Sequence, residues 1–372
     1  MNSPSDPGRY SLRTDYILWI LILGLLVLTI LNPEKIRLYL QLVHWPTIQA
    51  MLGLLILTSG FESSGWLSRV AGRIALHIHN ERLLALFLVA IAALLAMVLT
   101  NDVALFVVIP LTLSLSRFVS LPVRRLIVFE ALGVNCGAML TPIGNPQNIF
   151  LWQQSGIHFA SFMWGMLPLF LLSAGLLALF VCLAFKSLPI NRHAAQPDAR
   201  LNKRIFLIAA VLYLPFLILS DLHYTALALG IVTVAFLLTA PRLLYRIDWP
   251  LIVVLTLMFI DMRLLAQLSW VQHAIATLQL HQPEQLFVTG ALLSQAISNV
   301  PAAILLVGYS TDWKTLAWAV DVGGFGLVVG SLANLIALRI GRQRRTWLEF
   351  HLWSLPFFLL AGIFGLLWLW LI

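Results

Sequence analysis

Hydrophobic residues occur along the chain in runs long enough to cross a bilayer, separated by short polar or basic segments. A membrane helix needs about 20 mostly apolar residues. Runs of roughly that length predict membrane helices near residues 16–31, 46–61, 126–150, 163–185, 205–220, 224–240, 250–266, 316–338 and 352–371. The pattern therefore predicts an all-α polytopic membrane protein.

Two further apolar tracts, 83–116 and 286–309, do not fit single spans. As one helix the first would be about 51 Å long, against a hydrocarbon core of about 30 Å. Two full spans with a turn would need roughly forty residues or more. Near its middle lies the polar triplet Thr100-Asn101-Asp102. We therefore expect a re-entrant hairpin with the triplet near its tip, since irregular backbone at that depth must lie inside protein or beside water.

Composition narrows the class further. The chain is 60% hydrophobic and 10% charged, with a net charge of +8. The arginines cluster in short loops, as the positive-inside rule requires, so no nucleic-acid partner is expected. The two cysteines, Cys136 and Cys182, lie in apolar runs and indicate neither a disulfide framework nor a zinc site. His77 and His79 would face different ways on a helix, so no metal pair is expected there.

Loop charge predicts the side of the membrane to which each tract opens. Basic residues flank the first tract at both ends: Arg69, Arg73 and Arg82 before it, Arg117, Arg124 and Arg125 after it. Both flanks are therefore expected in the cytoplasm, whereas the sparse basic residues around the second tract predict external flanks. The side of the amino terminus stays open, because basic residues lie on both sides of the first span.

The two tracts also match as copies of one unit. "HWP" at His44 opens the span before the first tract, and "DWP" at Asp248 opens the span before the second. "TNDVALFVV" then matches "SNVPAAILL", and a later stretch matches more loosely. The matched pairs are Thr100 with Ser298, Asn101 with Asn299, Gly144 with Gly330, Asn145 with Ser331 and Asn148 with Asn334. Three matches in one order, with opposite loop charge, predict an inverted repeat.

The repeat divides the chain into two transmembrane halves. The first is 1–186 with the hairpin 83–116, and the second is 205–372 with the hairpin 286–309. Between them, residues 187–204 form a basic cytoplasmic linker.

Helix-breaking residues interrupt one span in each half. In "TPIGNPQN", Asn145 is a good helix cap and Pro146 occupies the favoured first helical position. Gly330 and Ser331 offer a milder break in the second half. We expect broken helices here.

The returning arms of the hairpins need caps too, and Asn101 or Asp102 and Ser298 or Asn299 can supply them. Four half-helix amino ends would then meet near the bilayer centre, where their N–H groups attract anions and unwound carbonyls suit sodium.

These elements define the expected substrate and ion site. Its residues are Thr100, Asn101, Asp102, Thr141, Gly144, Asn145, Asn148, Ser298, Asn299, Gly330, Ser331 and Asn334. Sodium, if it is the coupling ion, is expected at Asn101, Asp102 and Asn299.

Three carboxylates in apolar tracts are candidate proton carriers. Asp102 lies at the hairpin tip, with a plain helix cap as the alternative. Glu130 and Asp321 precede the two breaks, although the repeat pairs Asp321 with Asn135. For Glu130, a position near the cytoplasmic surface is the alternative.

The hairpin "TND", the paired "SNVP" and the "TPIGNPQN" break resemble the ion transporter superfamily. This group includes citrate–metal symporters, divalent-anion/sodium symporters, arsenite efflux pumps and sodium/proton antiporters. The resemblance runs from about His44 to the carboxyl end and implies an elevator-type secondary transporter with its site at the hairpin tips and broken helices. Divalent-anion/sodium symporters usually carry Ser-Asn-Thr in both hairpins. Thr-Asn-Asp and Ser-Asn-Val are nearer the arsenite-pump and citrate-type branches, which speaks against a dicarboxylate substrate.

The expected function is ion-coupled transport of a small anion, oxyanion or citrate-like carboxylate across the cytoplasmic (inner) membrane. Sodium or proton is the coupling ion, no cofactor is expected, and a homodimer is considered. Arsenite or antimonite efflux and sodium/proton antiport are the alternatives. An enzyme is not expected, because the chain has no His-Glu-x-x-His or Gly-x-Ser-x-Gly motif. It has no Walker-type phosphate loop either, so direct drive by ATP is not expected without a partner subunit. A channel is less favoured, since channels do not need inverted hairpins.

Overall fold

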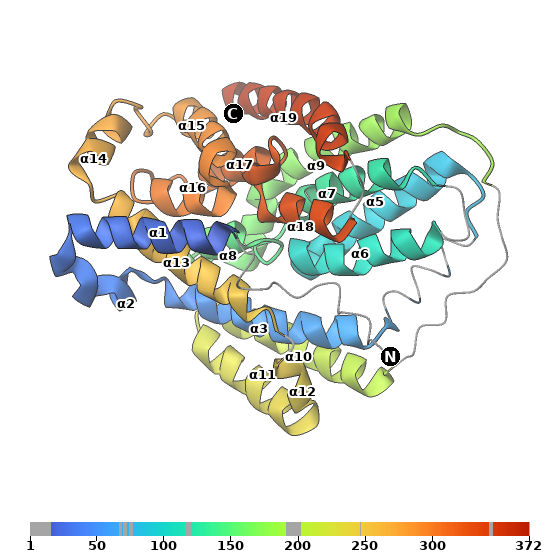
Figure 1. Ribbon diagram of the computed structural model, residues 1–372, viewed down its shortest axis with the longest axis horizontal. Helices are drawn as coiled ribbons and strands as arrows, with labels where there is room; N and C mark the ends of the chain where they lie inside the picture. The colour runs from blue at the N-terminus through green and yellow to red at the C-terminus, as the bar shows by residue number, and fades with distance from the viewer. Residues whose placement is uncertain are drawn as a thin grey trace.

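The computed structural model describes residues 16–66, 69, 73, 77–116, 121–190, 202–245, 247–341 and 345–371, and Figure 1 shows a bundle of helices. The described part of the chain contains no strand beyond an isolated bridge between Asn80 and Pro189. Within it, four helices are long and apolar enough to cross a membrane, or up to six if each of two bent helix pairs is one span. The chain is thus an all-α polytopic membrane protein, as predicted.

One group of helices is built around two that contact each other, α3 (Trp45–Ser63) and α13 (Trp249–Leu265). α1 (Tyr16–Leu31) packs on α13, while α10 (Lys203–Asp221) and α11 (Thr225–Thr239) pack on α3 and lie at the bottom of Figure 1. Short helices precede the two central ones: η1 (Pro33–Leu38) and α2 (Tyr39–Leu42) before α3, and α12 (Pro241–Leu244) before α13.

The remaining helices form a second group, in which the two halves run through the same order of elements. The first half contributes α5 (Glu81–Val98), α6 (Asn101–Leu115), α7 (Val123–Ala138), α8 (Pro146–Ser155) and α9 (Phe159–Ala184). The second contributes α15 (Pro283–Ile297), α16 (Asn299–Leu306), α17 (Trp313–Gly323), η2 (Val328–Gly330), α18 (Leu332–Gly341) and α19 (Thr346–Leu371). The short helix α14 (Ser269–Ala276) instead follows α13 of the first group at a bend of 79°. Each half thus has two helices folded on each other, a helix interrupted by a break, and a 26-residue helix.

The predicted hairpins correspond to α5–α6 and α15–α16, whose arms contact each other. Leu99 and Thr100 separate the first pair, and Ser298, at φ 74°, separates the second. The arms are unequal. α16 has eight residues, about 12 Å, and is too short to cross a membrane, whereas the 18 residues of α5 are long enough. Entry and return on one side of the membrane therefore stay a prediction.

Glycines allow the broken helices to approach the hairpins closely. A Cβ on Gly137 of α7 would lie 2.0 Å from the Ala93 carbonyl oxygen of α5. A Cβ on Gly323 of α17 would lie 2.4 Å from the Ser294 Cβ of α15. Neither contact leaves room for a side chain. The same kind of helix contact therefore recurs in both halves.

The beginning of the predicted linker lies along the start of α5. Asn80 Nδ2 donates to Ser187 Oγ at 2.9 Å, and the Ile190 N–H donates to the His79 carbonyl oxygen at 2.9 Å. These bonds hold the first linker residues against the first half. Residues 191–201, the middle of the predicted linker, lie outside the described residues.

Candidate functional site

The tip of the first hairpin is buried. Thr100, Asn101 and Asp102 expose 0, 3 and 4% of their surface. The Asn101 N–H donates to the Gly144 carbonyl oxygen at 2.8 Å, which joins the tip to the first helix break. Thr100 Oγ1 and Asp102 Oδ1 have no hydrogen-bond partner among the residues that the structure describes. Buried polar atoms are rarely left in that state, because the loss of water costs free energy.

The caps of the two hairpin arms differ from the prediction. The cap position of α6 is Thr100 and that of α16 is Ser298, and neither side chain makes a capping hydrogen bond. Asn101 and Asn299 are instead the first helical residues. Each side-chain oxygen accepts from the next backbone N–H, of Asp102 or Val300, at 2.9 Å. The expectation that Asn101 or Asp102 occupies the cap position is therefore wrong, because α6 already begins at Asn101. In the second hairpin Ser298, one of the two residues expected there, occupies the cap position, but without a capping hydrogen bond.

The first helix break has the predicted form. Asn145 caps α8 from extended backbone, its Oδ1 accepts from the Asn148 N–H at 2.9 Å, and Pro146 follows at the first helical position. A Cβ on Gly144 would lie 2.2 Å from a backbone oxygen, so only glycine fits. Thr141 Oγ1 donates to the backbone oxygen of Met97 at 2.8 Å, which ties the break to α5.

Asp321 of α17 is held by this break, although it belongs to the other half. Asn145 Nδ2 and Gln147 Nε2 donate to its Oδ1, each at 3.0 Å, and Asn148 Nδ2 donates to its Oδ2 at 3.0 Å. The carboxylate is 3% exposed. Gln147 is absent from the predicted site, although it lies between two predicted residues of the same motif.

Asn135 of α7, in the first half, makes corresponding contacts with the helix break of the second half. Ser331 Oγ donates to Asn135 Oδ1 at 3.1 Å, and Asn135 Nδ2 donates to Asn334 Oδ1 at 2.7 Å. In the predicted repeat Asn135 pairs with Asp321, and Ser331 and Asn334 pair with Asn145 and Asn148. Each break is thus bonded to the helix that precedes the other break. These corresponding contacts support the predicted repeat.

The second hairpin is joined to the second break by a residue that the sequence analysis missed. Gln295 Nε2 donates to the Gly323 carbonyl oxygen, and its Oε1 accepts from the Leu327 N–H, both at 2.6 Å. Asn299 at the tip is 2% exposed, and its Nδ2 lies 3.3 Å from where a Cβ on Gly324 would be. No motif marks Gln295, since its partners follow it by about thirty residues.

The predicted site residues therefore lie on segments that touch one another. Thr100 to Asp102 and Thr141 to Asn148 adjoin through the bond to Gly144, and the second break is joined to the first half through Asn135. α8 also contacts α16, the arm that begins at Asn299, and α18 contacts α6.

Glu130 lies away from these contacts, between α6 and α7. It is fully buried and accepts a hydrogen bond from Thr112, and its second oxygen has no partner among the described residues. The Glu130 side chain is thus enclosed by protein, and the alternative of a position near the cytoplasmic surface stays a prediction, because burial does not fix the depth in the membrane. Its predicted role as a proton carrier stays a prediction.

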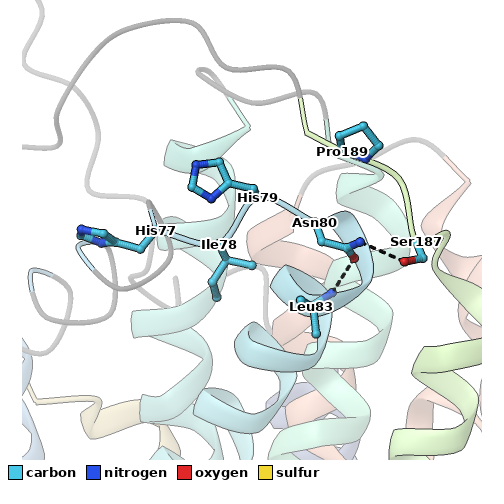
Figure 2. A pocket seen from close by; sticks show the side chains of 7 residues that line it. All are labelled: His77, Ile78, His79, Asn80, Leu83, Ser187 and Pro189. Atoms are coloured by element: carbon cyan, nitrogen blue, oxygen red, sulfur yellow. Dashed lines mark hydrogen bonds between the residues drawn. The ribbon is translucent and has the colours of Figure 1, made fainter.

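A pocket of about 680 Å³ lies elsewhere, beside the start of the linker (Figure 2). Its lining residues are His77, Ile78, His79, Asn80, Leu83, Ser187 and Pro189. None of them belongs to the predicted site. Among the described residues there is also no group of three or more His, Cys, Asp or Glu side chains that could hold a metal ion.

Comparison with known proteins gives consistent results. The profile of the citrate transporter family (CitMHS) matches residues 12–323. The inner membrane protein YbiR of Escherichia coli is 41% identical over 97% of each chain. An uncharacterized transporter of Methanocaldococcus jannaschii is 30% identical over 85% of this chain and 86% of that one. The silicon efflux transporter LSI3 of Oryza sativa is 32% identical over 40% of this chain and 31% of that one.

Proposed function

The chain belongs to the citrate transporter family, and from that premise we propose that it is an ion-coupled secondary transporter of a small anion or citrate-like carboxylate. Family and relatives make it a membrane transporter of the citrate or anion type rather than an enzyme. The substrate, the coupling to sodium or protons, and the mechanism are our proposals. The name of the Escherichia coli relative supports placement in the inner membrane.

One observation carries the proposal: two helix breaks are bonded across the halves inside an apolar bundle. Asn145 and Asn148 reach Asp321, while Ser331 and Asn334 bond to Asn135, and all six side chains are buried. Buried polar groups are costly in a membrane protein and mark ion and substrate pathways. Broken helices at such a centre present N–H groups to anions and carbonyl groups to cations.

The same contacts support an elevator-type movement. They join the helix breaks of both halves into one hydrogen-bonded body, and this body packs on the α3 and α13 layer through α8 and α16. We propose that the body moves as a unit past that layer and carries substrate and ion together. The negative Asp102 beside the site would repel an anion unless a cation or proton neutralised it.

A second candidate function is the efflux of an uncharged oxyacid such as arsenite or antimonite. The observation that favours it is the similarity to a silicon efflux transporter, which covers 40% of this chain. Hydroxyl groups of such a substrate would donate hydrogen bonds to the buried oxygens at the hairpin tip that have no partner among the described residues, Thr100 Oγ1 and Asp102 Oδ1. Sodium/proton antiport is the further alternative, for which the ion alone would be the cargo.

Transport into proteoliposomes tests the proposal. The purified protein is given labelled citrate, arsenite, silicic acid or sodium, each with an imposed sodium or proton gradient. We expect citrate to accumulate above equilibrium and to leak out when an ionophore collapses the gradient. Accumulation of arsenite or silicic acid instead would favour the second function. Movement of no solute, or movement that ignores every gradient, would overturn secondary transport.

A further inference from the structure

The carboxylate of Asp321 fixes the orientation of the amides around it. An ionised carboxylate accepts hydrogen bonds and donates none. The NH2 groups of Asn145, Gln147 and Asn148 must therefore face it, as the three distances of 3.0 Å show. The oxygen of each amide then points away from Asp321. The Asn145 oxygen is used, since it accepts from the Asn148 N–H.

The amide oxygens of Gln147 and Asn148 accept no hydrogen bond from the described residues. Gln147 Oε1 and Asn148 Oδ1 lack a hydrogen-bond partner in the described part of the chain, although the two residues are only 2% and 0% exposed. The hairpin tip that bonds to Gly144 carries two more such atoms, Thr100 Oγ1 and Asp102 Oδ1. These four oxygen atoms lie on segments that contact each other, and none has a hydrogen-bond partner among the described residues. This pattern indicates a ligand that binds to oxygen atoms.

The second half shows what happens without a carboxylate at this position. There Asn135 stands in the place of Asp321 and donates to Asn334 Oδ1. The Asn334 amide is consequently turned round, and its Nδ2 donates to the Gly324 carbonyl oxygen at 2.9 Å. Its oxygen is used up. The residue type at this position therefore determines which way the asparagine amide of the break, Asn148 or Asn334, is turned.

The set of oxygens suits a hard cation. One carboxylate oxygen, two amide oxygens and one hydroxyl are the kinds of ligand that such ions take. The described residues offer no cluster of His, Cys, Asp and Glu for a softer metal.

We propose that Asp321 is a positioning residue, which turns the Gln147 and Asn148 amides so that their oxygens bind a hard cation at the first break. This inference rests on the proposed function, in which the cation is either the coupling ion or a metal carried with the substrate. Sodium and magnesium represent these two sources.

An exchange of two residues tests the orientation. Asp321→Asn replaces one acceptor oxygen by an NH2 group. This group is expected in the place of Oδ2, because Oδ1 accepts two hydrogen bonds and Oδ2 only one. Asn148 must then turn its oxygen toward that group and lose it from the cation site. Adding Asn148→Asp reverses the pair, because one carboxylate oxygen at position 148 accepts the bond and the other faces the cation.

The readout is thermal unfolding of purified protein in rising sodium or magnesium chloride, with choline chloride keeping the ionic strength constant. A ligand that binds the native state raises its stability. We expect the melting temperature of the wild type to rise with one of the two cations. Asp321→Asn should need a concentration of that cation at least about tenfold higher for the same rise, because the loss of residues that orient metal ligands usually lowers metal affinity by about this factor. The double variant should recover most of the wild-type response to that cation. Asp221→Asn, at the end of α10, is the matched control and should respond normally.

Three results would overturn the inference: no response of the wild type to either cation, an unchanged response of folded Asp321→Asn, or a double variant that folds without recovering. Transport measured on the same preparations separates this from the proposed function. If the protein transports a solute but its stability does not respond to either cation, only the inference about Asp321 is contradicted. If its stability responds to a cation but no tested solute is transported, the proposed transport function is contradicted.

Discussion

Asn135 and Asp321 precede the two helix breaks, and each is hydrogen-bonded by the break of the opposite half. Asn135 meets Ser331 and Asn334, whereas Asp321 meets Asn145, Gln147 and Asn148. Neither half therefore completes its break alone. The two also differ in chemistry, because an amide both donates and accepts, and an ionised carboxylate only accepts. A repeated architecture thus holds two unlike sites.

The contact between α7 and α5 predicts a sensitive position. Gly137→Ala would place a Cβ 2.0 Å from the Ala93 carbonyl oxygen, so one of the helices must shift. We expect a loss of about 1–3 kcal/mol in stability, as overpacking usually costs, and a lower melting temperature in detergent.

Gly175→Ala is the matched control for this change. Gly175 also lies within a helix, α9, and a Cβ there would meet nothing within 4 Å. Its melting temperature should stay the same or rise slightly, since alanine favours helix. Equal melting temperatures for both variants would contradict the close packing of α7 on α5.

The topology prediction is testable by cysteine labelling. In a chain without Cys136 and Cys182, Leu121→Cys should react with an impermeant reagent only from the cytoplasmic side. Gln282→Cys should react from outside, as should positions 311–313, because basic residues flank the first tract and not the second. Labelling of position 121 from outside would rule out a first hairpin that opens to the cytoplasm.

A coupling role of Asp102 can be separated from a purely structural role in the first turn of α6. Its partner in the repeat is Val300, so the charge belongs to one half only. If Asp102 binds the coupling ion, Asp102→Asn should lose gradient-driven accumulation and keep exchange of bound substrate. An aspartate that only stabilises the first turn of α6 would tolerate the change at a cost of about 0.3–1 kcal/mol in stability, because asparagine has the same shape and lacks only the charge. Accumulation and exchange assays on the same proteoliposomes decide between them, and normal accumulation would remove the coupling role.

Local signals in the sequence predicted much of the fold. The motif "TPIGNPQN" contains a cap, a proline at the first helical position and a glycine that nothing else can replace, and α8 begins where these signals place it. The paired "HWP" and "DWP" motifs also behave alike. Trp45 Nε1 donates to the Leu40 carbonyl oxygen at 2.9 Å, and Trp249 Nε1 donates to that of Leu244 at 3.1 Å, five residues back in each case.

The connections between the halves could not be read from the sequence. Gln147 and Asp321 are 174 positions apart, and nothing local marks them as partners. The helix start was also misjudged at the first hairpin tip, whereas at the second tip Ser298, one of the two expected residues, is at the cap position. Asparagine is favoured as a cap, but the Asn101 and Asn299 side chains bond to the next N–H instead of reaching across the first turn.

The central claim is that the hairpin tips form the transport site, and the paired asparagines test it most directly. Asn101→Ala and Asn299→Ala each remove a buried amide at a tip. The loss of one such side-chain bond costs only about 0.5–1.5 kcal/mol, so both variants should reach the membrane in normal amounts.

The decisive measurement is gradient-driven accumulation of the transported solute by proteoliposomes that contain equal amounts of wild type, Asn101→Ala, Asn299→Ala or the control Gly175→Ala. Our account predicts that both asparagine variants lose accumulation while the control keeps it. If either asparagine variant folds and accumulates solute at the wild-type rate, the site does not lie at the hairpin tips.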